Sequence, residues 1–169
     1  MQDLIVVVCR GNIGRSPFAE AVINQELSRR GLHGKFHVIS RGVQGTAIDP
    51  EPVKFPNITY YKELYEDSKP TLDNLGIDLS KHTSTPINEN DADNASILLA
   101  LDDKTRKGLV GLFPRNANKI HLISELIGND QDIIDPEGVS GESHQRQLFT
   151  DLRETIVTGF PTLLEILKQ

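Results

Sequence analysis

The sequence predicts an α/β fold in which helices cover both faces of a central four-stranded parallel sheet, forming a three-layer sandwich. Two observations lead to this prediction. Short apolar segments rich in β-branched residues alternate along the chain with segments of helical spacing, and this alternation is typical of parallel strands joined by right-handed crossovers. The chain has 169 residues, which suits a single domain spanning 1–169 with its own core.

Four segments are predicted to be the strands of this sheet. Residues 3–8 (DLIVVV) form a continuous apolar run, as expected of a central strand buried on both faces. The other strands are predicted at 36–40, 95–101 and 119–123. A sheet of this Rossmann-like or flavodoxin-like kind binds its ligand beyond the carboxyl ends of its strands. We therefore expect the functional site directly after the first strand.

Helices are predicted between and after these strands. The first one has Ser16 as its N-cap and Pro17 at its first helical position, and it ends near Arg29-Arg30-Gly31. Further helices are expected at 71–75, 103–109 and 142–167. Gly159 and Pro161 are expected to kink or interrupt the last helix, because proline removes a backbone donor from the helix interior.

Composition excludes several classes of protein. Eighteen Lys and Arg against 24 Asp and Glu give a net charge of −6, which argues against a nucleic-acid partner. The apolar run 4–9 is too short for a membrane span or a signal peptide, so a cytoplasmic chain without a membrane partner is expected. The single cysteine excludes an internal disulfide and every zinc site built from several cysteines, and we expect no metal and no cofactor.

The stretch CRGNIGRS, residues 9–16, directly follows the first predicted strand. Glycine and asparagine tolerate left-handed backbone, so this turn can direct its N–H groups inward toward an anion. The start of the next helix adds further N–H groups and partial positive charge, a field that stabilises the thiolate of Cys9. Arg15 supplies a planar fork for two phosphate oxygens. A buried structural cysteine is the alternative for Cys9, but the glycines and Arg15 disfavour it. A Walker-type nucleotide loop is excluded, because no Gly-Lys-Ser/Thr follows.

The sequence VVVCRGNIGRSPFAEA resembles the N-terminal signature of the low-molecular-weight protein tyrosine phosphatases. The likeness continues at Ser40 after the second predicted strand and in GIDLSKH, which ends at His82. It also covers ILLALD, residues 97–102, and the late pair Asp135-Pro136. The resemblance implies a phosphotyrosine protein phosphatase that acts through a cysteinyl-phosphate intermediate.

The resemblance also implies a role for each residue of the site. Cys9 would be the nucleophile, and Arg15 would hold the equatorial oxygens of the phosphoryl group together with the loop N–H groups. The remaining residues expected to bind the phosphate are Arg10, Gly11, Asn12, Ile13, Gly14 and Ser16. The Ser16 hydroxyl would assist the sulfur. In the family, the asparagine side chain joins a supporting network with a serine and a histidine, which here would be Ser40 and His82.

The proton for the leaving group is assigned to Asp135, in DIIDPEG after the fourth predicted strand. A carboxyl group on an exposed turn serves both steps, as acid and then as base. Asp132 is the alternative acid. Asp49-Pro50 is a second Asp-Pro pair, which we interpret as a turn.

The chain departs from the family pattern in three respects. Gly14 stands where the family usually has a second cysteine, so no disulfide can protect the nucleophile within this chain. Glu137 and Gly138 follow Asp135-Pro136, where tyrosine-specific members carry aromatic residues. The segment 45–69 is predicted to be an enlarged loop, and it contains Phe55, Tyr60, Tyr61 and Tyr65. These aromatic residues either pack within the loop or form a wall for the substrate.

The sequence also bears on three alternatives to a tyrosine phosphatase. Arsenate reductases of this fold need further cysteines, which this chain lacks. Protein-arginine phosphatases tend to carry threonine where this chain has Ile13, and an apolar residue suits an aryl ester better. A non-catalytic phosphate-binding module would be expected to lose Cys9, Arg15 or Asp135. We therefore expect a monomer that takes a phosphotyrosine-containing protein as substrate and releases inorganic phosphate.

Overall fold

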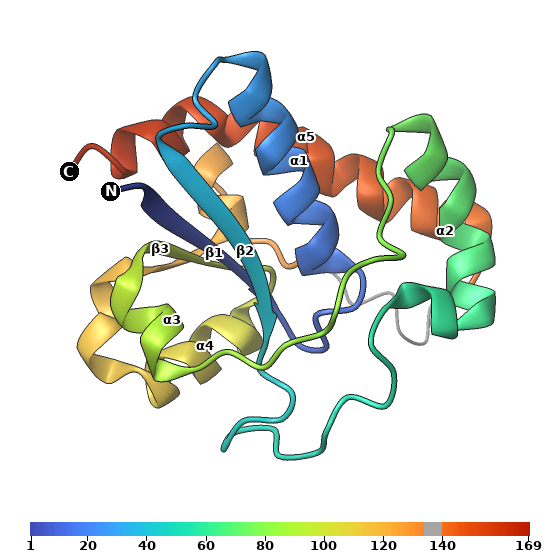
Figure 1. Ribbon diagram of the computed structural model, residues 1–169, viewed down its shortest axis with the longest axis horizontal. Coiled ribbons are helices and arrows are strands. Elements are labelled where there is room, and N and C mark those ends of the chain that lie inside the picture. Colours follow the sequence, from blue (N-terminus) through green and yellow to red (C-terminus); the bar gives the residue numbers. More distant parts are fainter. Residues whose placement is uncertain (134–139) are drawn as a thin grey trace.

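The computed structural model describes residues 1–133 and 140–169. Within these residues, four parallel strands form one sheet in the order β2-β1-β3-β4. The strands are β1 (Asp3–Cys9), β2 (Phe36–Gly42), β3 (Ala95–Ala100) and β4 (Ile120–Leu122). Figure 1 shows β1 and β2 side by side, with helices on either side. The predicted α/β fold with a four-stranded parallel sheet is therefore confirmed.

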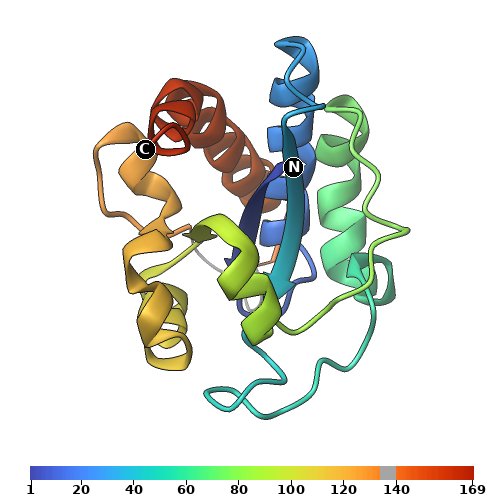
Figure 2. The same ribbon diagram turned by 60° about the vertical axis from the view of Figure 1, so that its left-hand side comes forward.

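Helices cover both faces of the sheet, as the two views in Figures 1 and 2 show. One face carries α1 (Arg15–Arg29), α2 (Lys62–Asn74) and α5 (Glu142–Ile166), and the other carries α3 (Glu89–Asn94) and α4 (Asp103–Leu112). Short 3₁₀ helices occupy connections between these elements: η1 (Ile58–Tyr60), η2 (Pro114–Lys119) and η3 (Ile123–Ile127). Of the described helices, none is both long and apolar enough to cross a membrane.

The central strand β1 is buried from both sides, as its sequence predicts. Ile5 and Val7 belong to the core under α1 and α5, whereas Val6 and Val8 belong to the core under α3 and α4. All four side chains have no exposed surface. Cys9 follows them at the carboxyl end of the strand, so the nucleophile candidate is attached to a strand that is packed on both faces.

Helix α1 begins earlier than the sequence predicts. Its first residue is Arg15 and its N-cap is Gly14, so the prediction of Ser16 as the N-cap is wrong. The hydroxyl of Ser16 contacts the sulfur of Cys9 instead, which leaves it unavailable for capping. Pro17 lies in the first turn, where the backbone N–H groups have no partner within the helix, and it therefore costs the helix no hydrogen bond.

The segment predicted as an enlarged loop is partly helical. After an irregular stretch it forms η1 and then α2, which runs from Lys62 to Asn74 rather than over 71–75. Pro70 lies inside α2. Because proline usually marks the start of a helix, the sequence pattern shows only the part of α2 that follows it.

Helix α5 continues through Gly159 and Pro161, so the expected interruption does not occur. Gly159 allows α5 to approach η3, because a Cβ atom at this position would lie 2.5 Å from the Cβ of Leu126. Leu126 of η3 and Phe160, the residue after Gly159 in α5, are buried in the same core. Close packing here outweighs the lost hydrogen bond at the proline.

Candidate active site

The loop between β1 and α1 lies at the carboxyl ends of the strands, where the sheet class predicts the site. A pocket of about 300 Å³ opens beside this loop. The loop contributes six of the lining residues, Cys9, Arg10, Gly11, Ile13, Gly14 and Arg15. The opposite wall is built by Gln44, Glu51, Pro52, Lys54, Tyr61 and Leu64. Within the described part of the chain, no group of three His, Cys, Asp or Glu side chains is placed to hold a metal ion.

The sulfur of Cys9 lies at the base of this pocket and is surrounded by donors. Cys9 is only 2% exposed, yet it lines the pocket. The backbone N–H of Asn12 donates to Sγ at 3.2 Å, and the Ser16 hydroxyl lies 3.0 Å from the same atom. Since α1 begins at Arg15, the positive end of its dipole also lies near the sulfur. The sulfur is thus placed where the loop gathers its hydrogen-bond donors.

The hydroxyl of Ser16 has one proton and two acceptors within reach. Asn12 Nδ2 donates to Ser16 Oγ at 2.9 Å, so the serine proton is directed elsewhere. Its possible acceptors are Cys9 Sγ at 3.0 Å and the carbonyl of Arg41 at 3.3 Å. A thiolate attracts this proton more strongly than a sulfur that is covalently bonded to a phosphoryl group does. Ser16 can therefore follow the charge of Cys9 by rotation of its hydroxyl alone.

Asn12 holds the loop in its curled conformation. Its φ of 55° lies in the left-handed region, which asparagine tolerates better than most residues. The fully buried side chain donates from Nδ2 to Ser40 Oγ at 3.0 Å as well as to Ser16, while Oδ1 accepts from the backbone N–H of Thr85 at 2.9 Å. Because this N–H fixes which end of the amide is oxygen, the orientation of Asn12 is determined by its partners.

His82 contacts the loop through one ring nitrogen. Its Nε2 lies 2.9 Å from the carbonyl of Asn12 and 3.0 Å from Asn12 Oδ1. Both atoms are acceptors, so Nε2 carries the hydrogen. Burial lowers the pKa of His82 below its ordinary value and the nearby Arg41 contributes in the same direction, outweighing the opposing effects of its hydrogen bond to Asn12 and of Glu20. The structure thus brings Asn12, Ser40 and His82 together in one network.

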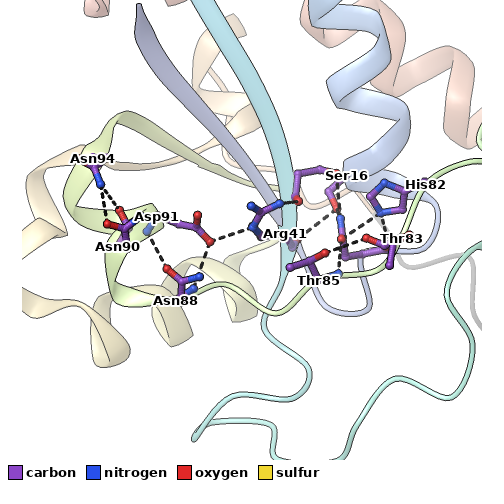
Figure 3. A network of polar contacts seen from close by, with 11 residues as sticks. Ser16, Arg41, His82, Thr83, Thr85, Asn88, Asn90, Asp91 and Asn94 are labelled. Carbon is purple, nitrogen blue, oxygen red and sulfur yellow. Dashed lines mark hydrogen bonds and ion pairs between the residues drawn. The ribbon is translucent and has the colours of Figure 1, made fainter. Parts of the chain in front are cut away.

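The network extends across the sheet to α3 (Figure 3). Arg41 Nε donates to Asp91 Oδ2 at 2.8 Å, and Asp91 itself forms a capping box with Asn88 at the start of α3. On the loop side, Ser84 Oγ donates to the carbonyl of Gly11 at 2.7 Å. The loop is therefore fixed by β2, by the segment around His82 and indirectly by α3.

Arg15 is held from behind by a carboxylate and a carbonyl. The residue is 2% exposed, and its Nη1 donates to Asp102 Oδ2 and to the carbonyl of Ile133, both at 2.7 Å. Burial raises the pKa of Asp102, but the hydrogen bonds from Arg15 and Thr105 outweigh it and hold that pKa below its ordinary value. Asp102 is therefore a carboxylate at neutral pH. The sequence places it only as the residue after the third strand and gives no sign of its contact with Arg15.

The opposite wall of the pocket comes from the segment with the aromatic cluster. Tyr61 and Leu64 line the pocket directly. Phe55 stacks on Tyr60 with ring centres 5.7 Å apart, and it meets Tyr61 edge-on at 5.5 Å. Tyr65 packs against the core. Tyr61 therefore belongs to the pocket wall, whereas Phe55 and Tyr60 pack on one another within the segment.

Asp49, which ends a turn that begins at Thr46, also has a partner in the loop. Arg10 Nε donates to Asp49 Oδ2 at 2.9 Å, and the carbonyl of Asp49 accepts from the N–H of Gly45 at 2.6 Å. The pair ties the start of the aromatic segment to the anion loop. The sequence predicts a turn at Asp49-Pro50, whereas the observed turn ends at Asp49, and the sequence gives no signal for the ion pair.

The predicted acid, Asp135, lies outside the described residues, together with Pro136, Glu137 and Gly138. The alternative acid is described and has a different environment. Asp132 Oδ1 accepts the backbone N–H of Asp103 at 2.7 Å, and Asp132 does not line the Cys9 pocket within the described part of the chain. Its contact is with the start of α4.

Comparison with known proteins places this geometry in context. The family model for the low molecular weight phosphotyrosine protein phosphatases matches residues 4–169. The chain is 25% identical over 163 residues to the low molecular weight protein-tyrosine-phosphatase YfkJ of Bacillus subtilis, covering 95% of this chain and 92% of that protein. It is 30% identical over 137 residues to the protein-arginine-phosphatase of the same organism, covering 80% and 81%.

Solved structures show the same similarity in three dimensions. A mutant of YwlE from Bacillus subtilis superposes with a TM-score of 0.78 at 26% identity, covering 97% of this chain and 99% of that one. The low molecular weight protein tyrosine phosphatase from T. tengcongensis gives a TM-score of 0.78 at 27% identity, with 95% and 99% covered.

Proposed function

The chain belongs to the low molecular weight phosphotyrosine protein phosphatase family and is an enzyme, and we propose that it hydrolyses phosphotyrosine in proteins through a cysteinyl-phosphate. The arrangement around Cys9 carries this proposal. Its sulfur receives the N–H of Asn12 at 3.2 Å, lies beside the Ser16 hydroxyl at 3.0 Å and shares its pocket with Arg15. A nucleophile, an anion cradle and a planar cation are the parts that phosphoryl transfer requires.

In the first step, the Cys9 thiolate attacks phosphorus in line with the bond to the tyrosine oxygen. A sulfur–phosphorus bond forms, and the phosphorus–oxygen bond breaks. The inward N–H groups of the loop and Arg15 stabilise the equatorial oxygens, which carry the developing charge. Asp135 gives its proton to the departing phenoxide. This assignment follows from the position of Asp135 in the chain, after β4 and before α5.

In the second step, water attacks the cysteinyl-phosphate and Asp135, now ionised, accepts a proton from that water. The sulfur departs as a thiolate, and inorganic phosphate is released. Ser16 assists because its proton, directed to the Arg41 carbonyl while sulfur carries phosphate, can turn toward Sγ as negative charge develops there. Asn12, Ser40 and His82 keep the loop curled through both steps.

The pocket walls support an aryl phosphate as the substrate. Ile13, Tyr61 and Leu64 present apolar or aromatic surface beside the loop, and a phenyl ring loses little hydrogen bonding when it is placed against them. Phosphoarginine is the second candidate. The similarity to a protein-arginine-phosphatase favours it, and so does Glu51, a carboxylate in the pocket wall that could receive a guanidinium group.

The decisive experiment compares one peptide that carries either phosphotyrosine or phosphoarginine at the same position. We expect wild type to release phosphate faster from the phosphotyrosine peptide and Cys9→Ser to release it from neither. A Glu51→Gln variant that loses activity selectively on phosphoarginine would move the assignment to the second candidate. Binding of phosphate without turnover by wild type would identify a non-catalytic module instead.

The acid is tested by the leaving group. Asp135→Asn should lower turnover of poor leaving groups by about 10²–10⁴-fold while reducing turnover of an activated aryl ester less. Asp132→Asn is the matched control, because it removes a neighbouring carboxylate that contacts α4. Equal losses on both substrates for Asp135→Asn, or the selective loss in Asp132→Asn, would reassign the acid.

We also place the enzyme in the cytoplasm as a monomer. The reaction requires a reduced Cys9, and a reducing compartment maintains free thiols. Sedimentation equilibrium of the full chain tests the monomer, and a mass that rises with concentration toward twice 18.8 kDa contradicts it.

A further inference from the structure

In the proposed reaction, the Ser16 hydroxyl depends on a carbonyl at the end of β2. Ser16 has no exposed surface, so its hydrogen must find an acceptor inside the protein. Among the described residues, the acceptors within reach are Cys9 Sγ at 3.0 Å and the carbonyl of Arg41 at 3.3 Å. A sulfur that is bonded to phosphorus accepts a hydrogen bond poorly, which leaves the Arg41 carbonyl for the cysteinyl-phosphate. The position of this carbonyl therefore affects how readily the intermediate forms.

The side chain of Arg41 fixes the backbone that carries this carbonyl. Its Nη1 donates to the carbonyl of Ser40 at 2.9 Å, and its Nε donates to Asp91 Oδ2 at 2.8 Å. β2 lies at one end of the sheet order, and among the described residues its outer side makes backbone hydrogen bonds only at Gly42. The guanidinium supplies a second fixed point, because it joins the preceding peptide of β2 to a separate helix.

Asp91 is itself held in place by α3. Its side chain is 8% exposed, and its Oδ2 also accepts the backbone N–H of Asn88 at 3.3 Å. The N–H of Asp91 donates back to Asn88 Oδ1 at 2.9 Å, which completes the capping box. The next residue, Ala92, is fully buried in the core between α3 and the sheet. The carboxylate thus has a fixed position independently of Arg41, and the pair is largely shielded from the water that weakens exposed ion pairs.

This ion pair stands apart from the surface that meets the substrate. Within the described part of the chain, neither Arg41 nor Asp91 lines the pocket. The neighbouring Gly42 has a different role, since a Cβ atom there would lie 2.8 Å from the carbonyl of Arg10 in the loop. Gly42 thus makes room for the loop, whereas Arg41 is placed to act on Ser16.

We propose that Arg41 and Asp91 are positioning residues for the reaction at Cys9, a role that rests on the proposed function. Their ion pair holds the Arg41 carbonyl where it accepts from Ser16 while sulfur is bonded to phosphorus (Figure 3). No proton is transferred in this movement. The hydroxyl rotates from Sγ to the carbonyl as the sulfur–phosphorus bond forms and the phosphorus–oxygen bond breaks. It rotates back when the sulfur departs as a thiolate.

The test measures kcat/KM of the full chain on p-nitrophenyl phosphate, which reports formation of the cysteinyl-phosphate. Arg41→Gln leaves the capping box of α3 intact and should lower kcat/KM by about three- to tenfold, the scale of a partly lost hydrogen bond. Asp91→Asn should lower it by less, because the asparagine oxygen can still accept from the guanidinium. Glu89→Gln is the matched control, because it removes a carboxylate of the same helix that pairs with Arg115 at 2.7 Å, and it should leave kcat/KM unchanged.

Two further measurements separate this role from a general loosening of the fold. In a Ser16→Ala background, Arg41→Gln should change kcat/KM by less than about twofold, because the hydroxyl through which it acts is gone. Inhibition of Arg41→Gln by inorganic phosphate should stay within about twofold of wild type, since the Ser16 hydroxyl can face Sγ in the free enzyme. Gly42→Ala provides the contrast, because its Cβ would displace the loop itself and should weaken phosphate binding.

Four results would overturn the proposal. The first is a kcat/KM for Arg41→Gln within about twofold of wild type, and the second is an equal loss in the Ser16→Ala background. The third is phosphate inhibition that weakens in Arg41→Gln in parallel with kcat/KM, and the fourth is an equal loss in Glu89→Gln. Failure of wild type to hydrolyse p-nitrophenyl phosphate would be a different result, because it would overturn the proposed function and this role with it.

Discussion

The two sides of the Cys9 pocket are built in opposite ways. Behind the loop, Asn12, Ser16 and Ser40 are at most 1% exposed, and their side chains hydrogen-bond to one another. On the facing wall, Glu51 and Lys54 are both exposed and come from irregular chain before η1. Transition-state stabilisation requires donors that are already in place, whereas substrate selection tolerates a wall that varies. The chemistry thus depends on the buried side and the choice of substrate on the open one.

The largest loss is expected where the buried side meets the phosphate. Arg15→Lys keeps the positive charge but loses the planar fork and its geometry toward Asp102 and Ile133. We expect kcat on an aryl phosphate to fall by about 10³-fold or more, because the group stabilises charge in transfer. Circular dichroism establishes whether the variant remains folded. A loss below tenfold in a folded variant would contradict the role given to the guanidinium.

A pair of substitutions at Asn12 separates its backbone from its side chain. Asn12→Gly keeps the left-handed conformation but deletes the side-chain hydrogen bonds, whereas Asn12→Ala deletes the same bonds and adds a conformational cost of about 1–2 kcal/mol. Both should lose about 10²-fold in kcat, the scale of a small misplacement of reacting groups. Urea unfolding should find Asn12→Ala the less stable of the two. Equal stabilities would show that the loop relaxes out of the left-handed region.

The lowered pKa of His82 predicts a smaller, pH-dependent effect on stability. A group whose pKa is depressed on folding contributes stability that is complete above its unfolded value, 6.5, and is lost as pH falls through the folded pKa. The difference in unfolding free energy between wild type and His82→Gln should therefore grow from pH 5 to about pH 7 and then level off. Urea titrations across this range measure it. A difference that shrinks as pH rises would reverse the sign.

The smallest effect is expected on the open wall. Tyr61→Leu keeps apolar volume in the pocket but removes the aromatic face beside Phe55. We expect KM for a phosphotyrosine peptide to rise by about two- to tenfold with kcat nearly unchanged, since uniform binding is lost. Steady-state kinetics on the peptide and on a small aryl phosphate give the comparison. A fall in kcat as large as that of Asn12→Gly would show that the open wall takes part in the chemistry.

The sequence predicts the sheet well because the residues of β1 themselves indicate a buried strand. A continuous β-branched run has few alternatives to a buried parallel strand, and the turn after it contains glycines and asparagine where curled backbone is needed. The boundaries of the elements depend more on tertiary contacts. Ser16 has the ordinary features of an N-cap, but its hydroxyl contacts Cys9, and this tertiary contact is invisible to local pattern.

The same contrast between local sequence pattern and tertiary contact applies to the site. Cys9 and Arg15 fall within one short motif, so their proximity follows from chain geometry. The contact of Arg15 with Asp102 joins residues 87 positions apart, and no local signal in the sequence indicates it. For Tyr61, the sequence shows the aromatic cluster but does not indicate which of its residues line the pocket and which pack within the segment. The end of η1 placed Tyr61 in the pocket.

The contacts that shape the loop have a consequence for the order of folding. Asn12 meets Ser40 across 28 residues and His82 across 70, while Arg15 meets Ile133 across 118. We expect such distant pairs to form after local structure, so that the anion cradle built from them is completed late in folding. Inorganic phosphate binds only the completed cradle, and at a hundredfold excess over its Kd it adds about 2.7 kcal/mol to the unfolding free energy. Phosphate should therefore slow unfolding in urea and leave the folding rate nearly unchanged, because the transition state does not yet contain its site.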